Sequence, residues 1–310
     1  MICAGVDIGG TKIEARLFSN DLTTLNARRV ATPTQDLDRF LDALADQIDW
    51  LQGQSGIDAM LPIGLAQPGL IDPRSGLAFT SNIPVSGRNV AAALAGRIGR
   101  VLPAINDCQA FTLSETRNGA ADGFASVVGL IMGTGIGAGL VVSGGATPRL
   151  NGSALEVGHI GVPARQLQSR GLPLWRCGCG KFGCFEQYAS GSGLAAIAQH
   201  RLGRLVTAET LVAEALGGAG DCAAVLDEWT ELVGELLYTI QISHDPDCIV
   251  IGGGVSRMPD ITIRLGDALR RLKLGEMDPP EIRVARHGDS SGARGAALMA
   301  RDMAEAAARA

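Results

Sequence analysis

The sequence predicts an α/β fold of two domains. The chain has 310 residues, which is enough for one large or two medium domains with well-formed cores. Strand-like apolar runs alternate with helix-like amphipathic segments. A strand, a Gly/Thr-rich turn and a second strand occur twice, in VDIGGTKIEARLF and in LIMGTGIGAGLVV. The repeated pattern indicates an internal duplication, with one copy in each half of the chain's core.

Composition narrows the class of partner. Hydrophobic residues make up 46% of the chain, the net charge is −5 and the pI is about 5.4. Nucleic acids and anionic membranes need basic surfaces, so neither is expected as the main partner. The first ten residues lack the basic flank and length of a signal peptide, and we find no uninterrupted apolar run of about 18 residues. We therefore expect a cytoplasmic protein.

The first glycine turn follows an apolar strand over residues 2–8. A second strand with alternating polarity follows the turn, whereas Rossmann and Walker loops are followed by a helix. Backbone N–H groups and a hydroxyl in such a turn can hold phosphate oxygens. We expect Asp7 to face a Mg²⁺ ion held by those phosphates, although a plain hairpin turn with a capping Asp is the alternative. The candidate phosphate-binding residues are Gly9, Gly10, Thr11 and Lys12.

The next segments predict a helix over 34–51, a strand over 61–66 and a long loop that begins at Gln67. Asn82 in this loop is a candidate ligand contact, or simply a turn residue. Residues 101–105 predict a strand, and Asn106 and Asp107 follow at its carboxyl end, where open α/β sheets bind ligands. A helix to residue 117 starts at once. Asp107 is therefore either a helix cap or a functional carboxylate.

The second glycine turn joins strands predicted over 126–132 and 140–143. Its spacing G-x-G-x-x-A imitates a dinucleotide motif, but a strand follows it instead of a helix. Beyond it we expect helices over 190–201, 207–216, 221–244, 258–272 and 291–308, and strands over 248–251 and 281–285. The last helix should pack on the N-terminal domain. Gly253 and Gly254 either let a planar group approach the backbone or form a left-handed turn. The candidate nucleotide-binding residues here are Gly133, Thr134, Gly135, Gly253 and Gly254.

The segment from Leu155 to Glu186 carries the most specific chemistry. Three cysteines within eight residues and one upstream histidine form a donor set suited to tetrahedral Zn²⁺. A disulfide or a redox site is the alternative, but a bridge between Cys-x-Cys sulfurs is strained. Glu156 and Glu186 lie beside these ligands, so a structural metal would stiffen a platform that presents carboxylates to a polar ligand. The candidate metal ligands are His159, Cys177, Cys179 and Cys184.

EVGH at residues 156–159 and CGCGKFGCFE at 177–186 resemble the signature of the ROK family of sugar kinases and sugar-responsive repressors. The resemblance is strongest to its bacterial N-acetyl-D-glucosamine kinases and covers essentially the whole chain. It implies a two-domain actin-like ATPase fold (duplicated ribonuclease-H-like) with a structural zinc site. The expected domains are residues 1–118 with 289–310, closed by the C-terminal helix, and residues 119–288. It also implies ATP with Mg²⁺ as cofactors, a bound Zn²⁺ and a homodimer. Gly252, Gly253 and Gly254 would form the motif on the adenosine side of the nucleotide.

The expected reaction is phosphorylation of the 6-hydroxyl of N-acetyl-D-glucosamine by ATP. The resemblance makes Asp107 the general base, which would accept the proton of the attacking hydroxyl. Sugar hydroxyls need fixed acceptors, and the candidates are Asn82, Asn106, Asp107, Glu156, His159 and Glu186. A fructokinase, a glucokinase or an N-acetylmannosamine kinase is an alternative, because the tail RHGDSSGARGAA also resembles bacterial fructokinases. A sugar-responsive regulator fits less well, because such proteins carry a DNA-binding domain before the kinase-like core and the first strand here already starts at Ile2. A zinc-ribbon interaction module also fits less well, because it would not need glycine turns far from the cysteines.

Overall fold

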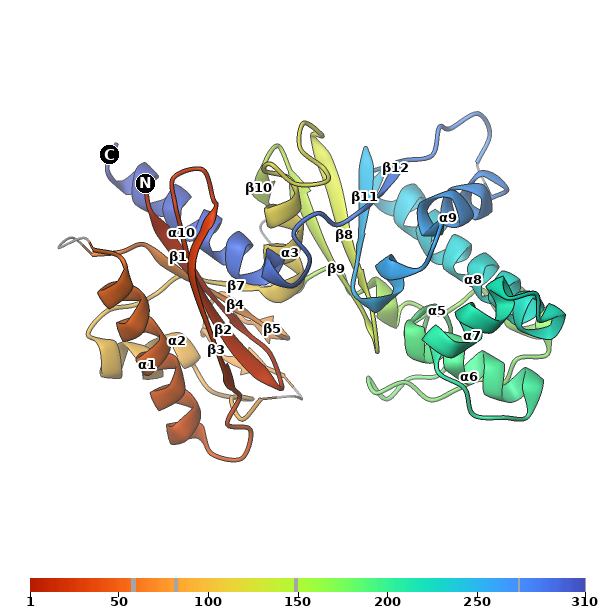
Figure 1. Ribbon diagram of the computed structural model, residues 1–310, viewed down its shortest axis with the longest axis horizontal. Coiled ribbons are helices and arrows are strands. Elements are labelled where there is room, and N and C mark those ends of the chain that lie inside the picture. Colours follow the sequence, from red (N-terminus) through yellow and green to blue (C-terminus); the bar gives the residue numbers. More distant parts are fainter. Residues whose placement is uncertain (57–59, 81–82, 148–149, 273, 310) are drawn as a thin grey trace. The chain divides into compact units, whose positions relative to one another are not determined.

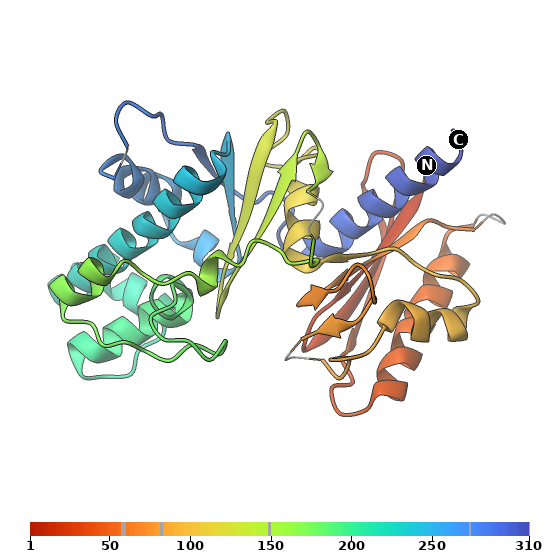
Figure 2. The same cartoon turned by 180° about the vertical axis from the view of Figure 1, so that it is seen from behind.

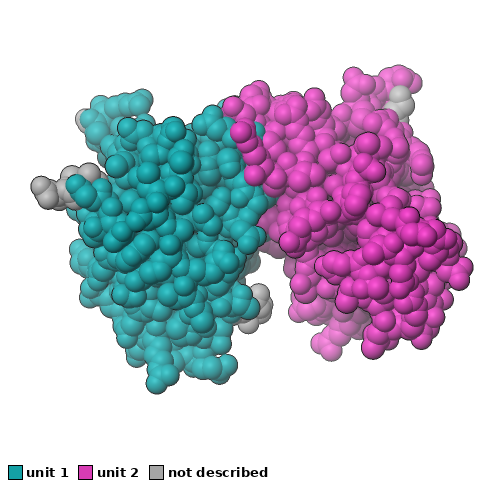
Figure 3. All heavy atoms as spheres, viewed as in Figure 1, with its two compact units in different colours: residues 1–119, 139–154, 287–310 teal, residues 120–138, 155–286 magenta. Residues whose placement is uncertain are grey.

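The computed structural model describes residues 1–56, 60–80, 83–147, 150–272 and 274–309. The chain folds into two compact units, which Figure 3 distinguishes by colour. Unit 1 comprises residues 1–119, 139–154 and 287–310, and unit 2 comprises residues 120–138 and 155–286. Unit 1 thus includes residues 139–154, which lie beyond the predicted boundary at residue 118.

Unit 1 is built on a five-stranded mixed sheet of order β3-β2-β1-β4-β7. The first glycine turn joins β1 and β2, which are antiparallel, while β4 runs parallel to both β1 and β7. A small two-stranded sheet pairs β5 with β6. The elements are β1 (Cys3–Ile8), β2 (Lys12–Phe18), β3 (Thr24–Ala31), α1 (Leu37–Gln54), β4 (Ile63–Gln67), β5 (Leu70–Ile71), β6 (Ala78–Phe79), α2 (Val90–Ile98), β7 (Ala104–Asn106), α3 (Asp107–Glu115), η3 (Gly288–Ser290) and α10 (Ser291–Ala307).

Helices cover both faces of this sheet (Figures 1 and 2). Apolar side chains of β1, β2 and β4 pack against α1 and α2 in one core cluster. A second cluster joins Ala66 and Ile105 to α3 and α10. The helix α10 packs against β1 and β4 at two glycines. A Cβ on Gly5 would lie 1.8 Å from the Ala293 carbonyl oxygen, and a Cβ on Gly64 would lie 2.0 Å from the Ala296 carbonyl oxygen. These glycines let a helix from the end of the chain lie on its first strand.

The second five-stranded sheet has the order β10-β9-β8-β11-β12, with β11 parallel to β8 and β12. Both sheets therefore place a glycine hairpin beside two parallel strands, which is the arrangement that an internal duplication produces. Trp229 on the long helix α8 is fully buried and donates its Nε1–H to the Ser190 carbonyl at 3.1 Å. The elements are β8 (Ser126–Met132), β9 (Ile136–Val142), β10 (Gly145–Ala146), η1 (Val157–His159), α4 (Ala164–Arg170), α5 (Glu186–Ala189), α6 (Gly191–Leu202), α7 (Ala208–Leu216), α8 (Gly220–His244), β11 (Cys248–Gly252), η2 (Gly254–Arg257), α9 (Ile261–Arg270) and β12 (Glu281–Val284).

The structure adds elements that the sequence analysis did not predict. The strand β3 alternates only between exposed and half-buried residues, so its apolar signal is weak. The helix α2 follows an Asn89 cap and ends at Gly99, which has a φ of 74°.

The strand β9 begins at Ile136, not at Leu140 as predicted, because its glycines resemble a loop. Among the described residues, no helix is both long and apolar enough to cross a bilayer.

Candidate active site and metal cluster

Asp107 is the first residue of α3, and Asn106 fixes its position. The Asn106 backbone is extended, with φ −62° and ψ 143°, and its Oδ1 accepts hydrogen bonds from the N–H groups of Cys108 at 2.8 Å and Gln109 at 3.2 Å. This is the geometry of a helix N-cap. The Asn106 Nδ2 donates to the Gly69 carbonyl at 2.9 Å. Asn106 therefore joins the start of α3 to the loop after β4, and its side chain is largely occupied by these bonds.

Two carboxylates of unit 1, Asp7 and Asp107, have raised pKa values at this edge of the sheet. Burial raises the pKa of Asp107, while a hydrogen bond from the Cys108 N–H at 2.8 Å acts in the opposite direction. Burial, followed by the charges of Asp107 and Glu14, raises the pKa of Asp7 to about 7. A carboxylate with a raised pKa suits a general base. A carboxylate whose pKa is raised by a second carboxylate, as that of Asp7 is by Asp107, also suits a divalent cation, whose charge would offset theirs.

The first glycine turn is braced by hydrogen bonds within unit 1. The Gly9 N–H donates to the Lys12 carbonyl at 2.8 Å, and the Thr32 hydroxyl donates to the Gly9 carbonyl at 2.7 Å. The Thr32 N–H donates to the Thr11 carbonyl at 3.1 Å. The Lys12 ammonium lies 3.5 Å from Asp289 and 3.8 Å from Glu14. The lysine predicted to bind phosphate is therefore paired with two carboxylates in this structure.

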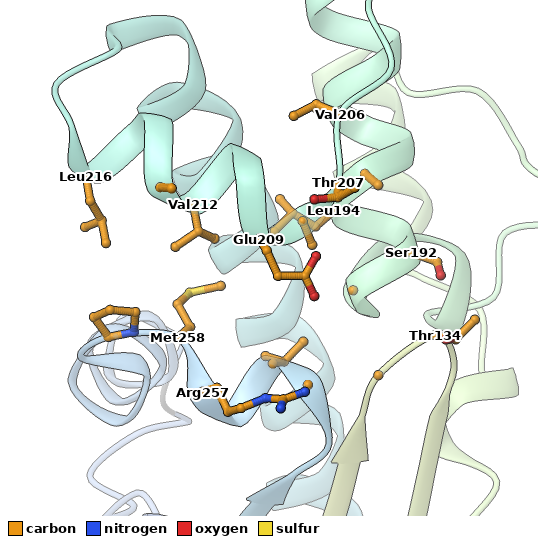
Figure 4. A pocket seen from close by; sticks show the side chains of 18 of the residues that line it. Thr134, Ser192, Leu194, Val206, Thr207, Glu209, Val212, Leu216, Arg257 and Met258 are labelled. Carbon is orange, nitrogen blue, oxygen red and sulfur yellow. The ribbon is translucent and has the colours of Figure 1, made fainter.

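The second glycine turn lies at one end of a cavity of about 1250 Å³ within unit 2 (Figure 4). The Gly133 N–H donates to the Gly135 carbonyl at 3.0 Å, and the Gly191 N–H donates to the Gly133 carbonyl at 2.8 Å. The turn is thereby attached to the start of α6. Gly133, Thr134 and Gly254 line the cavity, as do residues from α6, α7 and η2. Three of the predicted nucleotide-binding residues thus share one cavity.

Gly253 and Gly254 have different environments. Gly254 lines the cavity, whereas Gly253 is not among the residues that line it. Gly253 has a φ of 78°, and a Cβ there would lie 2.4 Å from the Met132 carbonyl oxygen. The close approach of β8 to the end of β11 therefore accounts for glycine at position 253.

The four candidate metal ligands come together in unit 2. One donor atom from each of His159, Cys177, Cys179 and Cys184 lies within 4.8 Å of every other. His159 Nδ1 is 3.6 Å from the Cys177 sulfur, and the sulfurs of Cys179 and Cys184 are 3.7 Å apart. Tetrahedral bonds of about 2.3 Å to sulfur require sulfurs roughly 3.8 Å apart. The donor types and their spacing therefore fit one tetrahedral metal ion.

The two glutamates of this segment have different surroundings. Glu156 is exposed, and its carboxylate lies 4.0 Å from Nε2 of His159. Glu186 is half-buried, and its Oε2 accepts a hydrogen bond from the Ile136 N–H at 3.1 Å. Its Oε1 is 3.6 Å from the Cys177 sulfur. Glu186 therefore lies between the cysteine cluster and the strand that leaves the second glycine turn.

The predicted site residues fall into two groups, one in each unit. Asp7, residues 9–12, Asn106 and Asp107 belong to unit 1, and the second glycine turn, the metal ligands and the two glutamates belong to unit 2. Asn82 lies outside the described residues. Residues missed by the sequence analysis include Ser192, Glu209 and Arg257, which line the cavity. The run Ser-Gly-Ser-Gly at 190–193 could have indicated a ligand-binding helix start, whereas Glu209 looks like an ordinary acid in the first turn of a helix.

Gln67 is a further residue that the sequence analysis did not select. It is the last residue of β4 and pairs with Asn106 on β7. The residue is 2% exposed, and its side-chain Nε2 has no hydrogen-bond partner among the described residues. A buried amide of this kind is a donor available to a ligand bound beside Asn106.

Comparison with known proteins defines the class to which this fold and site belong. The ROK family model matches residues 3–303, and the chain belongs to the ROK family. An N-acetylgalactosamine kinase of Shewanella sp. and an N-acetyl-D-glucosamine kinase of Escherichia coli are each 37% identical to it over 298 residues. That alignment covers 95% of this chain, 95% of the Shewanella protein and 98% of the E. coli protein.

Solved structures show the same fold. The ROK hexokinase of Thermus thermophilus has a TM-score of 0.86 and 32% identity, and the match covers 98% of this chain and 99% of that one. A ROK glucokinase of Streptomyces griseus, solved with glucose and AMPPNP, has a TM-score of 0.77 and 28% identity, with 97% and 100% of the two chains covered. The α/β fold with mixed sheets is thus that of the ROK sugar kinases, within the actin-like ATPase family.

Proposed function

We propose that this protein transfers the γ-phosphoryl group of ATP to the 6-hydroxyl of an N-acetylhexosamine, with N-acetyl-D-glucosamine as the preferred acceptor. The observation that carries the proposal is the carboxylate of Asp107, which is half-buried, has a raised pKa and is positioned by the cap at Asn106. The names of the two relatives that are 37% identical over nearly the whole chain support the class of acceptor.

Asp107 is the proposed general base. It accepts the proton of the sugar hydroxyl as the oxygen attacks the γ-phosphorus, and its raised pKa suits that role. Phosphoryl transfer depends mainly on positioning and on neutralising the charge of the phosphoryl oxygens. Backbone N–H groups of the two glycine turns would contribute part of that neutralisation. Mg²⁺ held with Asp7 would supply the rest, which fits the carboxylate pair of unit 1.

The proposed sugar contacts are Asn82, Asn106, Glu156, His159 and Glu186. Carboxylates accept several hydrogen bonds from hydroxyl groups, and Glu156 is exposed. His159 directs Nδ1 towards the cysteines and Nε2 towards Glu156, so it can link the metal cluster to a sugar hydroxyl. Asn106 is proposed mainly as the residue that positions Asp107.

The proposed nucleotide site is the cavity of unit 2. Its volume is of the order that small-molecule sites have, and glycine backbone is available at one end. The AMPPNP bound by the related Streptomyces glucokinase supports ATP as the phosphoryl donor.

Zn²⁺ is the proposed metal of the cysteine cluster. With four protein ligands and no open position, it would have a structural role. It would fix His159 and the neighbouring Glu186, and both are proposed sugar contacts.

N-acetyl-D-galactosamine is a second candidate acceptor, because the Shewanella relative is named for it. An ADP-release assay with both N-acetylated sugars, N-acetylmannosamine, glucose, mannose and fructose tests the proposal. We expect the highest kcat/KM with N-acetyl-D-glucosamine. A higher value for glucose or fructose would contradict the N-acetylhexosamine class, and absence of sugar-dependent ADP release would contradict the kinase function.

A further inference from the structure

The cavity of unit 2 changes character along its length (Figure 4). Thr134 and Ser192 lie at one end. The lining glycines are at the same end: Gly133 and Gly191 adjoin these residues in the chain, and a Cβ on Gly133 would lie 4.0 Å from the Gly254 nitrogen. Val212, Leu216 and Met258 lie at the other end. Phosphates prefer backbone N–H groups and hydroxyls, whereas the faces of a purine prefer apolar side chains. A nucleotide would therefore bind with its phosphates at the glycine end and its base at the apolar end.

Two charged side chains lie between these ends. Glu209, in the first turn of α7, and Arg257, in η2, extend into the middle of the cavity from opposite walls (Figure 4). Neither makes a hydrogen bond or ion pair with any described residue. Arg257 is directed to the glycine end, because its guanidinium nitrogen lies 3.8 Å from the position of a Cβ on Gly254. Arg257 is thus placed for the phosphate nearest the sugar, and Glu209 for an uncharged group.

We infer that Glu209 is the residue by which this protein distinguishes ribonucleotides from 2′-deoxyribonucleotides. This inference rests on the proposed use of ATP. With phosphates at one end and the base at the other, the ribose occupies the middle of the cavity, where Glu209 lies. A carboxylate has two oxygens and can accept hydrogen bonds from the 2′- and 3′-hydroxyls together. A 2′-deoxyribose leaves one of these oxygens without its donor.

The chemistry of the carboxylate favours the ribose over other parts of the nucleotide. A phosphate beside Glu209 would bring like charges together, and the apolar end offers little that could hold a phosphate. An ordinary acid in the first turn of a helix would stabilise α7 slightly and would not affect nucleotide choice. Ribose contact and helix stabilisation can be distinguished, because only contact with the ribose changes the ratio of the affinities for ADP and 2′-deoxy-ADP.

Binding of ADP and 2′-deoxy-ADP to the full-length protein tests the inference by titration calorimetry, without any need for turnover. We expect the wild-type protein to bind ADP about tenfold more tightly than 2′-deoxy-ADP, as for loss of a hydrogen bond to a charged group. In Glu209→Ala this preference should fall below about threefold, mainly because ADP binds more weakly. The kcat/KM values for ATP and 2′-deoxy-ATP should change in the same ratio.

Glu214→Gln is the matched control, since Glu214 lies on the same helix but pairs with Arg204 away from this cavity. It should keep the wild-type preference, and melting temperatures establish that both variants fold. A wild-type protein that binds both nucleotides equally, or a Glu209→Ala protein that keeps the preference, would overturn the inference and leave the kinase proposal intact. A wild-type protein that binds no adenine nucleotide would overturn both.

Discussion

The carboxylate of Glu186 accepts a hydrogen bond from the backbone N–H of Ile136 at 3.1 Å. Ile136 is the first residue of β9, directly after the second glycine turn, and the other oxygen of Glu186 lies 3.6 Å from the Cys177 sulfur. A Cβ on Gly135 would lie 2.6 Å from Glu186 Oε2, so the turn and the carboxylate are in close contact. One side chain therefore contacts both the metal cluster and the proposed phosphate-binding turn.

This contact predicts that Glu186 affects both substrates. Glu186→Ala should raise KM for the sugar and for ATP, each by about tenfold, since it removes a proposed sugar acceptor and the partner of the Ile136 N–H. Glu186→Gln keeps an amide oxygen for Ile136, so its effect on ATP should be smaller than its effect on the sugar. Steady-state kinetics with each substrate varied in turn provides the measurement. An unchanged KM for ATP in Glu186→Ala would show that the contact with the turn is not used.

The cap of α3 predicts a graded response at Asn106. Asn106→Ala removes the cap and the bond to Gly69, and should lower the free energy of unfolding by about 1–2 kcal/mol. Asn106→Ser can still cap α3 but cannot donate to Gly69, so it should be less destabilising while lowering kcat. Denaturant unfolding and steady-state kinetics separate the two effects. Equal loss of stability in both variants would contradict the assignment of the cap.

Burial of Asp107 predicts a stability cost that depends on pH. Its pKa is raised in the folded chain, so the folded protein binds this proton more tightly than the unfolded chain does. Its contribution to stability is present below the unfolded pKa and is lost as the pH rises through the folded pKa. Asp107→Asn should therefore raise Tm by about 2 °C or more at pH 8, and the gain should shrink as the pH falls towards about 4, the ordinary pKa of an Asp side chain.

Thermal melts at several pH values measure this difference. Asp122→Asn, at an exposed position of unit 2, serves as the control and should leave Tm nearly constant across the series. A lower Tm for Asp107→Asn at pH 8 would mean that the ionised carboxylate stabilises the fold, contrary to this account.

The cysteine cluster predicts joint loss of stability and sugar affinity when the metal is removed. Dialysis against a chelator, or Cys179→Ser, should lower Tm and raise KM for the sugar, because the proposed sugar contacts Glu156 and Glu186 lie beside the ligands and His159 is itself a ligand. Elemental analysis should find about one zinc per wild-type chain and less in the variant. Cys222→Ala, a thiol outside the cluster, should retain the metal. Metal-free protein with unchanged Tm and KM would refute the proposed platform.

Local pattern was sufficient to predict much of the fold. The strands around both glycine turns, the helix after Asp107 and the cysteine cluster all follow from periodicity, spacing or residue chemistry. The strands around the glycine turns and the helix after Asp107 are observed with bounds a few residues from those predicted, and β9 begins four residues earlier. The motifs EVGH and CGCGKFGCFE predicted membership of the ROK family, and the match of the ROK family model to residues 3–303 confirms it.

The rest depends on contacts between distant residues. Nothing in the sequence near Glu186 indicates a bond to Ile136, fifty positions earlier. The close approach of the Met132 carbonyl to Gly253 is equally absent from the local sequence pattern. Glu209 gains its proposed meaning only when α7 and η2 form opposite walls of one cavity. Such relationships arise from tertiary packing, which no local pattern specifies.

The central claim, that Asp107 is the base in phosphoryl transfer to a sugar, is tested most directly by comparing the turnover of the wild-type protein and Asp107→Asn with N-acetyl-D-glucosamine and ATP. Phosphorus NMR should identify the 6-phosphate as the product of the wild-type protein. Asp107→Asn should fold, bind both substrates and lose kcat by about 10²–10⁴-fold. Near-native turnover by Asp107→Asn would contradict the account.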